Sequence, residues 1–237
     1  MLIAMFEKRS ERLERIDTGD YTPEEYAVFL REIRFINRFI GDVRALKKTF
    51  LREIAAKKQR EFSVLDVGAG SGEMLRVVAD FARRKNLKCE LLGLELNELS
   101  ANSIRAESQN YAEIKAVRAD AFRLPFADKS FDYAICSLFA HHFTDENLVL
   151  ILTEFNRVTR RKIFVIDLHR HRIAYLSYQL FCTVFRISRL VREDGSLSVL
   201  RGFKPKELEK LAVRANLKNI SVRRVAPFRL VLSADAN

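Results

Sequence analysis

The chain has 237 residues, 48% hydrophobic and 31% charged, a composition typical of a globular protein, which excludes a disordered one. The net charge of +11 leaves nucleic acid, an anionic membrane surface or an acidic substrate open as partners. The three cysteines show no CxxC spacing, which argues against a disulfide framework and a zinc site. We therefore expect no metal and a cytoplasmic location, since no apolar run reaches the length of a membrane helix.

Residues 1–60 have a basic, helical pattern. Thr22-Pro23-Glu24-Glu25 is typical of a helix start, in which Thr22 caps the helix and Glu25 completes a capping box. Apolar residues then recur at helical spacing, at Phe29, Ile33, Ile36 and Ile40. A second basic helix is expected over Val43–Lys58. We predict that residues 1–60 form an N-terminal helical cap.

From Phe62 onward, short apolar runs alternate with helical patterns, which indicates a mostly parallel sheet with helices on both faces. The first five strands are predicted at Phe62–Val67, Lys88–Leu94, Ile114–Arg118, Phe131–Leu138 and Lys162–Asp167. The end of the chain, at Asn219–Val225 and Phe228–Leu232, predicts an antiparallel hairpin around Pro227. The expected fold class is therefore α/β, with seven strands in a single domain over residues 61–237.

A glycine loop, Gly68-Ala69-Gly70-Ser71-Gly72, follows the first of these strands and opens a helix. Glycines allow a sharp turn and close approach of a ligand to the main chain, and a helix start offers unpaired N–H groups. Asp66 stands just before the turn, and no lysine follows the glycines, which excludes a P-loop. A carboxylate at this point suits a ligand with a positive end, such as the amino group of methionine.

Two more acids follow later strands. Glu95 comes at the end of the second strand, roughly 20 residues beyond the glycines, a spacing expected for a carboxylate that binds ribose hydroxyls. Asp120 follows the third strand and is able to accept a hydrogen bond from an exocyclic amine, such as that of adenine. Aspartate is also common in loops, so this signal is weak alone.

The stretch from Phe62 to Asp167 resembles the class I S-adenosylmethionine-dependent methyltransferase family, which has a Rossmann-like fold. The phrase over Leu124–Tyr133 is similar to the ubiquinone and menaquinone methylase branch, which methylates small molecules at oxygen or carbon. The resemblance implies S-adenosylmethionine as cofactor. It implies as cofactor-binding residues Asp66, Gly68, Ala69, Gly70, Gly72, Glu95, Leu96, Asp120, Ala121 and Ser137. One departure is Thr159-Arg160-Arg161-Lys162, where many relatives have a Lys-Pro-Gly-Gly turn.

His141 and His142 follow the fourth strand, where the methyl acceptor is expected. A histidine there is able to take a proton from a hydroxyl or an acidic carbon, and the resemblance favours His142 as this base. A purely structural role for either histidine stays open. The residues predicted to contact the substrate are His169, Arg170, Tyr175 and Tyr178.

Ile173–Val191 is predicted as one long apolar helix, and residues 171–192 as a helical insertion or lid. A lid favours a lipophilic or aromatic acceptor, such as a quinone or polyketide. As a surface helix flanked by arginines, the same segment would contact an anionic membrane. Plain core packing or a dimer interface also fits, so the protein is expected to be a monomer or a homodimer.

Three alternatives to small-molecule methylation are nucleic-acid methylation, a nicotinamide enzyme and a binding module without transfer activity. Methylation of RNA or another nucleic acid is favoured by the basic segments Arg157–Lys162 and Arg201–Arg224. It is disfavoured because no Asn/Asp-Pro-Pro-Tyr/Phe pattern follows the fourth strand. A nicotinamide enzyme would need the spacing Gly-x-Gly-x-x-Gly, which this loop lacks. A binding module without transfer activity is disfavoured by the intact glycine loop.

Overall fold

The computed structural model describes residues 4–57 and 59–237, without the side chains of some residues in the N-terminal part. Met1–Ile3 and Lys58, and the side chain of Ile40, lie outside the described residues. One seven-stranded sheet has the order β3-β2-β1-β4-β5-β7-β6. Its strands are β1 (Glu61–Val67), β2 (Lys88–Glu95), β3 (Ile114–Arg118), β4 (Phe131–Ser137), β5 (Thr159–Leu168), β6 (Lys218–Val225) and β7 (Arg229–Asp235).

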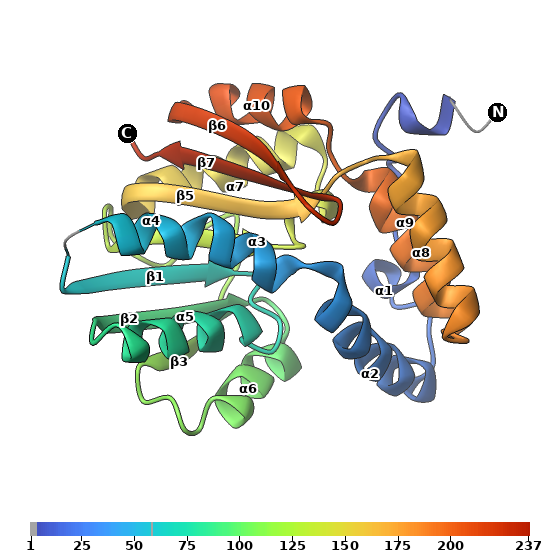
Figure 1. Cartoon of the computed structure of the whole chain (residues 1–237), viewed down its shortest axis with the longest axis horizontal. Helices are drawn as coiled ribbons and strands as arrows, with labels where there is room; N and C mark the ends of the chain where they lie inside the picture. Colours follow the sequence, from blue (N-terminus) through green and yellow to red (C-terminus); the bar gives the residue numbers. More distant parts are fainter. Residues whose placement is uncertain (1–3, 58) are drawn as a thin grey trace.

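Neighbouring strands pair in parallel from β3 through to β5, and β7 pairs antiparallel with both β5 and β6. The sequence prediction of a Rossmann-like sheet with an antiparallel C-terminal hairpin is confirmed. The parallel strands all point their carboxyl ends toward the same edge, on the right in Figure 1. This edge is where ligands bind in open α/β sheets.

Helices cover both faces of the sheet (Figure 1). One face packs against α3 (Asp42–Lys48), α4 (Phe50–Ala56) and α5 (Glu73–Arg84), and the other against α7 (Asp145–Val158) and α10 (Pro205–Arg214). A further helix, α6 (Glu98–Glu107), lies beside β2 and β3. Each helix buries one apolar stripe, which on α5 consists of Met74, Leu75, Val78, Ala79 and Ala82.

The single helix predicted over Val43–Lys58 is two helices, α3 and α4, because the chain bends at Thr49. Thr49 has φ −119° and ψ −80°, outside the helical region, and its hydroxyl donates to the carbonyl of Ala45 at 2.7 Å. A threonine side chain that bonds to the preceding turn competes with the helical pattern and bends it. Both helices belong to the core of the sheet, since Leu46 and Phe50 are buried there.

A separate group of helices stands at the carboxyl edge of the sheet and is called the cap here (Figure 1). It consists of α1 (Arg15–Thr18), α2 (Pro23–Ile40), α8 (Arg172–Val184) and α9 (Arg189–Arg201), with α1, α2 and α8 all packed on α9. The predicted capping box of α2 is present, because Thr22 Oγ accepts from the Glu25 amide and Glu25 accepts from the Thr22 amide. Of the first 60 residues, therefore, α1 and α2 join the cap, whereas α3 and α4 pack on the sheet.

The single long helix predicted over Ile173–Val191 is wrong: α8 ends at Val184 and α9 begins at Arg189. Arg186, in the turn between them, has a left-handed φ of 52°. Glu32 of α2 holds this turn by accepting from the amide and the hydroxyl of Ser188, at 3.0 and 2.6 Å. Gly195 then lets the helices approach, since a Cβ there would lie 2.1 Å from Tyr178 Oη. None of the described helices is long and apolar enough to cross a membrane.

Candidate active site

The glycine loop between β1 and α5 is bent by three residues in the left-handed region. Gly68, Gly70 and Gly72 have φ values of 70°, 59° and 80°, which side chains rarely adopt. A Cβ on Gly68 would lie 2.3 Å from the ring of Phe139, whereas a Cβ on Gly70 would meet nothing within 4 Å. The loop therefore packs tightly at its start and is open at Gly70.

Asp66 lies buried beneath this loop at the end of β1, with 1% of its surface exposed. Neither carboxylate oxygen has a hydrogen-bond partner among the described residues. Burial, together with the nearby Glu95, raises the pKa of Asp66 well above its ordinary value. An unpaired buried carboxylate costs free energy, so this side chain fits a site completed by a ligand with a cationic group.

Glu95 ends β2 and turns its carboxylate toward the glycine loop, where it accepts from the amide of Gly70 at 2.5 Å. Burial raises the pKa of Glu95, although its bonds to backbone amides oppose the shift. Glu95 also lines a large cavity, together with Asn97 and Ser100 at the start of α6. The glycine loop and Glu95, which the sequence predicts to act together, are therefore in direct contact.

The other predicted cofactor residues differ in their burial and in their contacts. Asp120 accepts from the amide of Phe122 at 2.9 Å, and Ala121 beside it is buried. The Ser137 hydroxyl, at the end of β4, is buried without a hydrogen-bond partner among the described residues. Leu96 is 65% exposed, and Ala69 packs against the core on the α5 face. Of the ten residues predicted to bind the cofactor, Glu95 alone contributes to the wall of the large cavity.

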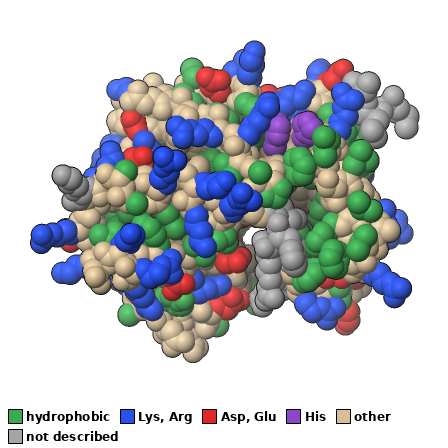
Figure 2. Space-filling view, in the orientation of Figure 1, with side chains coloured by type: hydrophobic (Ala, Val, Ile, Leu, Met, Phe, Trp, Pro, Cys, Tyr) green, Lys and Arg blue, Asp and Glu red, His purple; other side chains and the backbone are tan. Residues whose placement is uncertain are grey.

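This cavity lies between the carboxyl edge of the sheet and the cap and has a volume of about 630 Å³. Figure 2 shows the hollow between these two parts of the molecule. The sheet side supplies Leu138, His141, His142 and Leu168. The cap side is mostly apolar and includes Phe29, Ile33, Ile36 and Phe181. A large apolar cavity with a few polar groups is the usual form of a small-molecule site.

His141 belongs to a short 3-10 helix, η2 (Ala140–His142), that follows β4. Its Nδ1 lies 2.7 Å from Asp167 Oδ1 at the end of β5, and both residues are buried. Burial alone would raise the pKa of Asp167, but the charge and hydrogen bond of His141 outweigh it and lower that pKa. With Nδ1 engaged, the remaining nitrogen of His141, Nε2, lies 3.9 Å from Glu14 Oε1.

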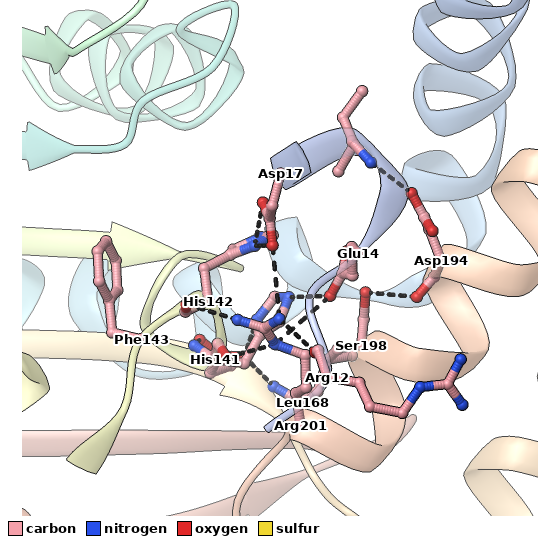
Figure 3. A network of polar contacts seen from close by, with 12 residues as sticks. Arg12, Glu14, Asp17, His141, His142, Phe143, Leu168, Asp194, Ser198 and Arg201 are labelled. Carbon is pink, nitrogen blue, oxygen red and sulfur yellow. Dashed lines mark hydrogen bonds and ion pairs between the residues drawn. The ribbon is translucent and has the colours of Figure 1, made fainter. Parts of the chain in front are cut away.

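His142 has the same arrangement with a different acid (Figure 3). Its Nδ1 lies 3.0 Å from Asp17 Oδ1, which α1 contributes from the N-terminal part of the chain. Burial opposes protonation of His142, but Asp17 and Glu14 together outweigh burial and raise its pKa. The two imidazole rings lie 4.3 Å apart. In each ring, therefore, a carboxylate orients Nδ1, and Nε2 remains for another partner.

Arg201 of α9 connects the cap to the loop that carries the histidines (Figure 3). Its guanidinium is buried and donates to the carbonyl oxygens of His141, His142 and Arg12. Glu14, Asp17 and Arg201 are not predicted from the sequence, and each lies more than 100 residues in sequence from at least one partner. No local pattern marks such residues, because their role arises only when the N-terminal segment folds back over the sheet.

Of the four predicted substrate contacts, Tyr178 lines the cavity, and its hydroxyl donates to the Val191 carbonyl at 2.7 Å. Tyr175 instead packs edge-on against Phe6, with ring centres 5.8 Å apart. His169 lies outside the cavity wall, and burial, with Arg224 nearby, lowers its pKa to about 4.

The structure corrects the prediction that Arg170 contacts the substrate. Its side chain is fully buried, forms an ion pair with Glu207 and donates to the Gly202 carbonyl at 2.6 Å. The residue instead joins β5 to the start of α10, because a buried guanidinium needs several acceptors.

Part of the chain matches known proteins in sequence. Residues 65–166 match the family model described as "Methyltransferase domain". The chain is 30% identical over 114 residues to the ubiquinone/menaquinone biosynthesis C-methyltransferase UbiE of Rickettsia prowazekii (strain Madrid E), over 47% of this chain and 45% of that protein. Residues 65–166 of the chain therefore carry a methyltransferase domain. It spans about half the length of the curated relatives it matches.

Solved structures show the same fold around this methyltransferase domain. The magnesium protoporphyrin IX methyltransferase (ChlM) from Synechocystis PCC 6803, with bound SAH, has a TM-score of 0.64 at 13% identity. That match covers 94% of this chain and 100% of the other. The CMeT domain of the citrinin polyketide synthase has a TM-score of 0.61 at 14% identity, over 79% of this chain and 50% of that chain. S-adenosylmethionine is the cofactor of this class.

Replacing Asp66 tests whether its unpaired carboxylate serves the cofactor. The pKa of the Asp66 carboxyl is higher in the folded protein than in the unfolded one. The contribution of this group to stability is therefore lost as the pH rises through the folded pKa, and the ionised carboxylate destabilises the fold. Asp66→Asn should leave the thermal unfolding midpoint at pH 7 equal or higher. It should also weaken S-adenosylmethionine binding at least about tenfold in calorimetry, since it removes a charged acceptor.

The matched control is Asp128→Asn, at an exposed carboxylate paired with Arg157. This variant should leave cofactor affinity unchanged. If Asp66→Asn binds S-adenosylmethionine as tightly as the wild type, Asp66 does not hold the cofactor.

Proposed function

We propose that this protein transfers a methyl group from S-adenosylmethionine to oxygen or carbon of a small lipophilic or aromatic acceptor. The observation that carries this proposal is the apolar cavity that adjoins Glu95 and two carboxylate-bound histidines. The names of two similar proteins support a small acceptor, since one is a ubiquinone/menaquinone C-methyltransferase and another a magnesium protoporphyrin IX methyltransferase.

The cofactor residues have distinct proposed roles. Asp66 and the glycine loop would bind the methionine end, because a buried carboxylate without a donor matches an ammonium group. Glu95 would bind the ribose, Asp120 and Ala121 the adenine, and Ser137 would lie near the methyl group. S-adenosylmethionine supplies an electrophilic methyl group on a good sulfur leaving group, so positioning provides most of the acceleration.

His142 and His141 are the proposed acid–base residues. A carboxylate on Nδ1 fixes the ring and its tautomer, so that Nε2 presents a lone pair. An imidazole held this way is able to take a proton from an acceptor hydroxyl or acidic carbon. Both residues line the cavity, where the acceptor would lie against the cap.

The cap is proposed to act as a lid on the catalytic domain of residues 61–237. Helix α8 is an insertion in that domain and is proposed to be the part of the lid that moves. Phe181 of α8 lines the cavity together with Phe29 and Ile33 of α2. Opening the cap would admit the acceptor, and closing it would exclude water from the site.

The outer face of α8 carries a continuous apolar row. Ile173, Leu176, Leu180 and Val184 are 57%, 53%, 65% and 64% exposed and recur at helical spacing on one side. Figure 2 shows hydrophobic side chains gathered over the cap, with Lys and Arg at its border. We propose that this row contacts an anionic membrane surface peripherally, with arginines at both helix ends beside lipid phosphates.

A cytoplasmic location is proposed as well. The three cysteines are all free, and Cys136 and Cys182 are buried. Free cysteines are typical of a reducing compartment. A monomer and a homodimer through α8 both fit.

The nucleic-acid alternative has less support, because the basic segment at the end of α7 is largely neutralised. Arg157 pairs with Glu154 and Asp128, and Arg160 and Arg161 both pair with Asp132. Ion-paired arginines are poor counterions for phosphate. The apolar cavity wall also offers few groups for recognising a base.

A transfer assay tests the proposed substrate class. Protein incubated with methyl-labelled S-adenosylmethionine and a cell extract should place the label in the lipid and small-molecule fraction. Heat-denatured protein is the control for label that does not depend on the fold. Label found in RNA alone would overturn the proposed substrate class.

The role of His142 is tested by its replacement. His142→Ala should lower turnover by about 10² to 10⁴, the usual contribution of a positioned base, with S-adenosylmethionine affinity nearly unchanged. His171→Ala is the matched control, because this histidine does not line the large cavity. Unchanged turnover in His142→Ala would show that His142 is not the base.

The membrane contact is tested by sedimentation with vesicles that contain phosphatidylglycerol. The double variant Leu176→Glu and Leu180→Glu should lose most binding at moderate salt, because charges replace the apolar row. Val213→Glu is the control, at a residue on α10 that is 62% exposed. Equal binding by both variants, or none by the wild type, would contradict the membrane proposal.

A further inference from the structure

We propose that Glu14, His141 and His142 bind a divalent transition-metal ion at the wall of the cavity. One ligand atom from each residue lies within 4.8 Å of the other two, and all three residues line the cavity. In the part of the chain that the structure describes, no other three His, Cys, Asp or Glu residues converge in this way. Two imidazoles and one carboxylate are a common donor set for such ions.

The two histidines of the cluster each have a carboxylate on one ring nitrogen, as histidine ligands of metal ions usually do. A histidine ligand usually donates its other ring N–H to a carboxylate, which fixes the ring and makes the ligand nitrogen more basic. His141 has Asp167 on Nδ1, and His142 has Asp17 on Nδ1. The second nitrogen of each ring is therefore the one available for a ligand. Figure 3 shows the Asp17 carboxylate against the ring of His142.

Glu14 supplies an independent observation. Only 3% of its surface is exposed, yet its Oε1 accepts no hydrogen bond from any described residue. Arg201 Nε lies 3.8 Å from this oxygen, but the guanidinium directs its N–H groups to backbone carbonyls of His141, His142 and Arg12. A buried carboxylate oxygen without a donor is costly, and a bound cation would satisfy it.

The charge around the cluster also favours a cation. The carboxylates of Glu14, Asp17 and Asp167 face the single guanidinium of Arg201. With neutral imidazoles, this group therefore has an excess of two negative charges in a largely buried region. A divalent ion would balance that excess when both imidazoles are unprotonated, as metal ligands must be.

The donor set selects the class of ion. Imidazole nitrogens suit zinc, copper, iron and nickel, whereas magnesium, calcium and manganese prefer oxygen ligands. Three protein ligands leave coordination positions open, as in catalytic rather than structural sites. If the proposed methyl transfer is correct, an acceptor oxygen would take such a position and its pKa would fall. The base role proposed above then applies to the metal-free protein, since a nitrogen that binds an ion has no lone pair left for a proton.

Metal binding is measured on the whole chain with Co²⁺, whose visible absorption reports coordination, and with Zn²⁺ by calorimetry, after treatment with EDTA. We expect one ion per chain. Glu14→Gln and His142→Ala should weaken binding at least tenfold, and Asp17→Asn should weaken it about 10- to 100-fold, as loss of a carboxylate behind a histidine ligand does. His169→Ala, a histidine outside the cavity, should bind like the wild type.

Absence of Co²⁺ and Zn²⁺ binding by the wild type would overturn the proposal, as would unchanged binding in Glu14→Gln. Circular dichroism establishes that each variant is folded, and if Glu14→Gln is not, the His142 and Asp17 variants decide. S-adenosylmethionine is titrated into the same EDTA-treated protein. Metal binding without cofactor binding would overturn the proposed methyl transfer alone, and cofactor binding without metal binding would overturn the metal site alone.

Discussion

The common direction of the parallel strands places the polar ends of β1, β2, β4 and β5 at one edge of the sheet. Asp66, Glu95 and Asp167 each lie at the end of one of these strands, where backbone pairing gives way to loops. Burial at that edge is costly for a carboxylate, and the three acids meet this cost differently. Asp167 pairs with His141 and Glu95 with a loop amide, whereas Asp66 has no donor. The unpaired acid marks where a cationic ligand is needed.

At the same edge, the cap and the N-terminal segment provide hydrogen-bond donors for backbone carbonyls. The loop after β4 exposes the backbone carbonyls of His141, His142 and Phe143, and two guanidiniums satisfy them, those of Arg201 and Arg9. Arg201 comes from α9 and Arg9 from the N-terminal segment, so the carbonyls hold both segments over the sheet. The remaining cap walls are mostly apolar, which leaves a cavity with an apolar side and a polar side. Such a site suits an apolar acceptor with one reacting polar group.

Much of the fold follows from local patterns in the sequence. Alternating strands and helices, the glycine loop and the Thr22 capping box each depend on near neighbours, and the structure has all of them. The two breaks within predicted helices were not predicted, because side-chain contacts and not apolar periodicity determine where these helices end. The turn after α8 is held by Glu32 of α2, and the bend at Thr49 uses a side-chain bond that apolar periodicity does not reveal.

The candidate site also contains residues that local spacing predicts and residues that only the folded chain brings together. The cofactor loop and Glu95 are contiguous with strands and were predictable by spacing, whereas Glu14 and Asp17 reach the histidines only through the folded N-terminal segment. Arg170 shows the opposite error, because a charged residue in a loop pattern is buried against Glu207. Pairings across more than 100 residues leave no trace in a single sequence.

The most direct test of the central claim is a backbone amide NMR titration of the wild-type protein with S-adenosylmethionine. We expect the largest shift changes at Gly68, Gly70 and Gly72 and at the residues that follow Glu95, with one molecule bound per chain. Saturating cofactor that leaves these amides unchanged in a folded protein would contradict it.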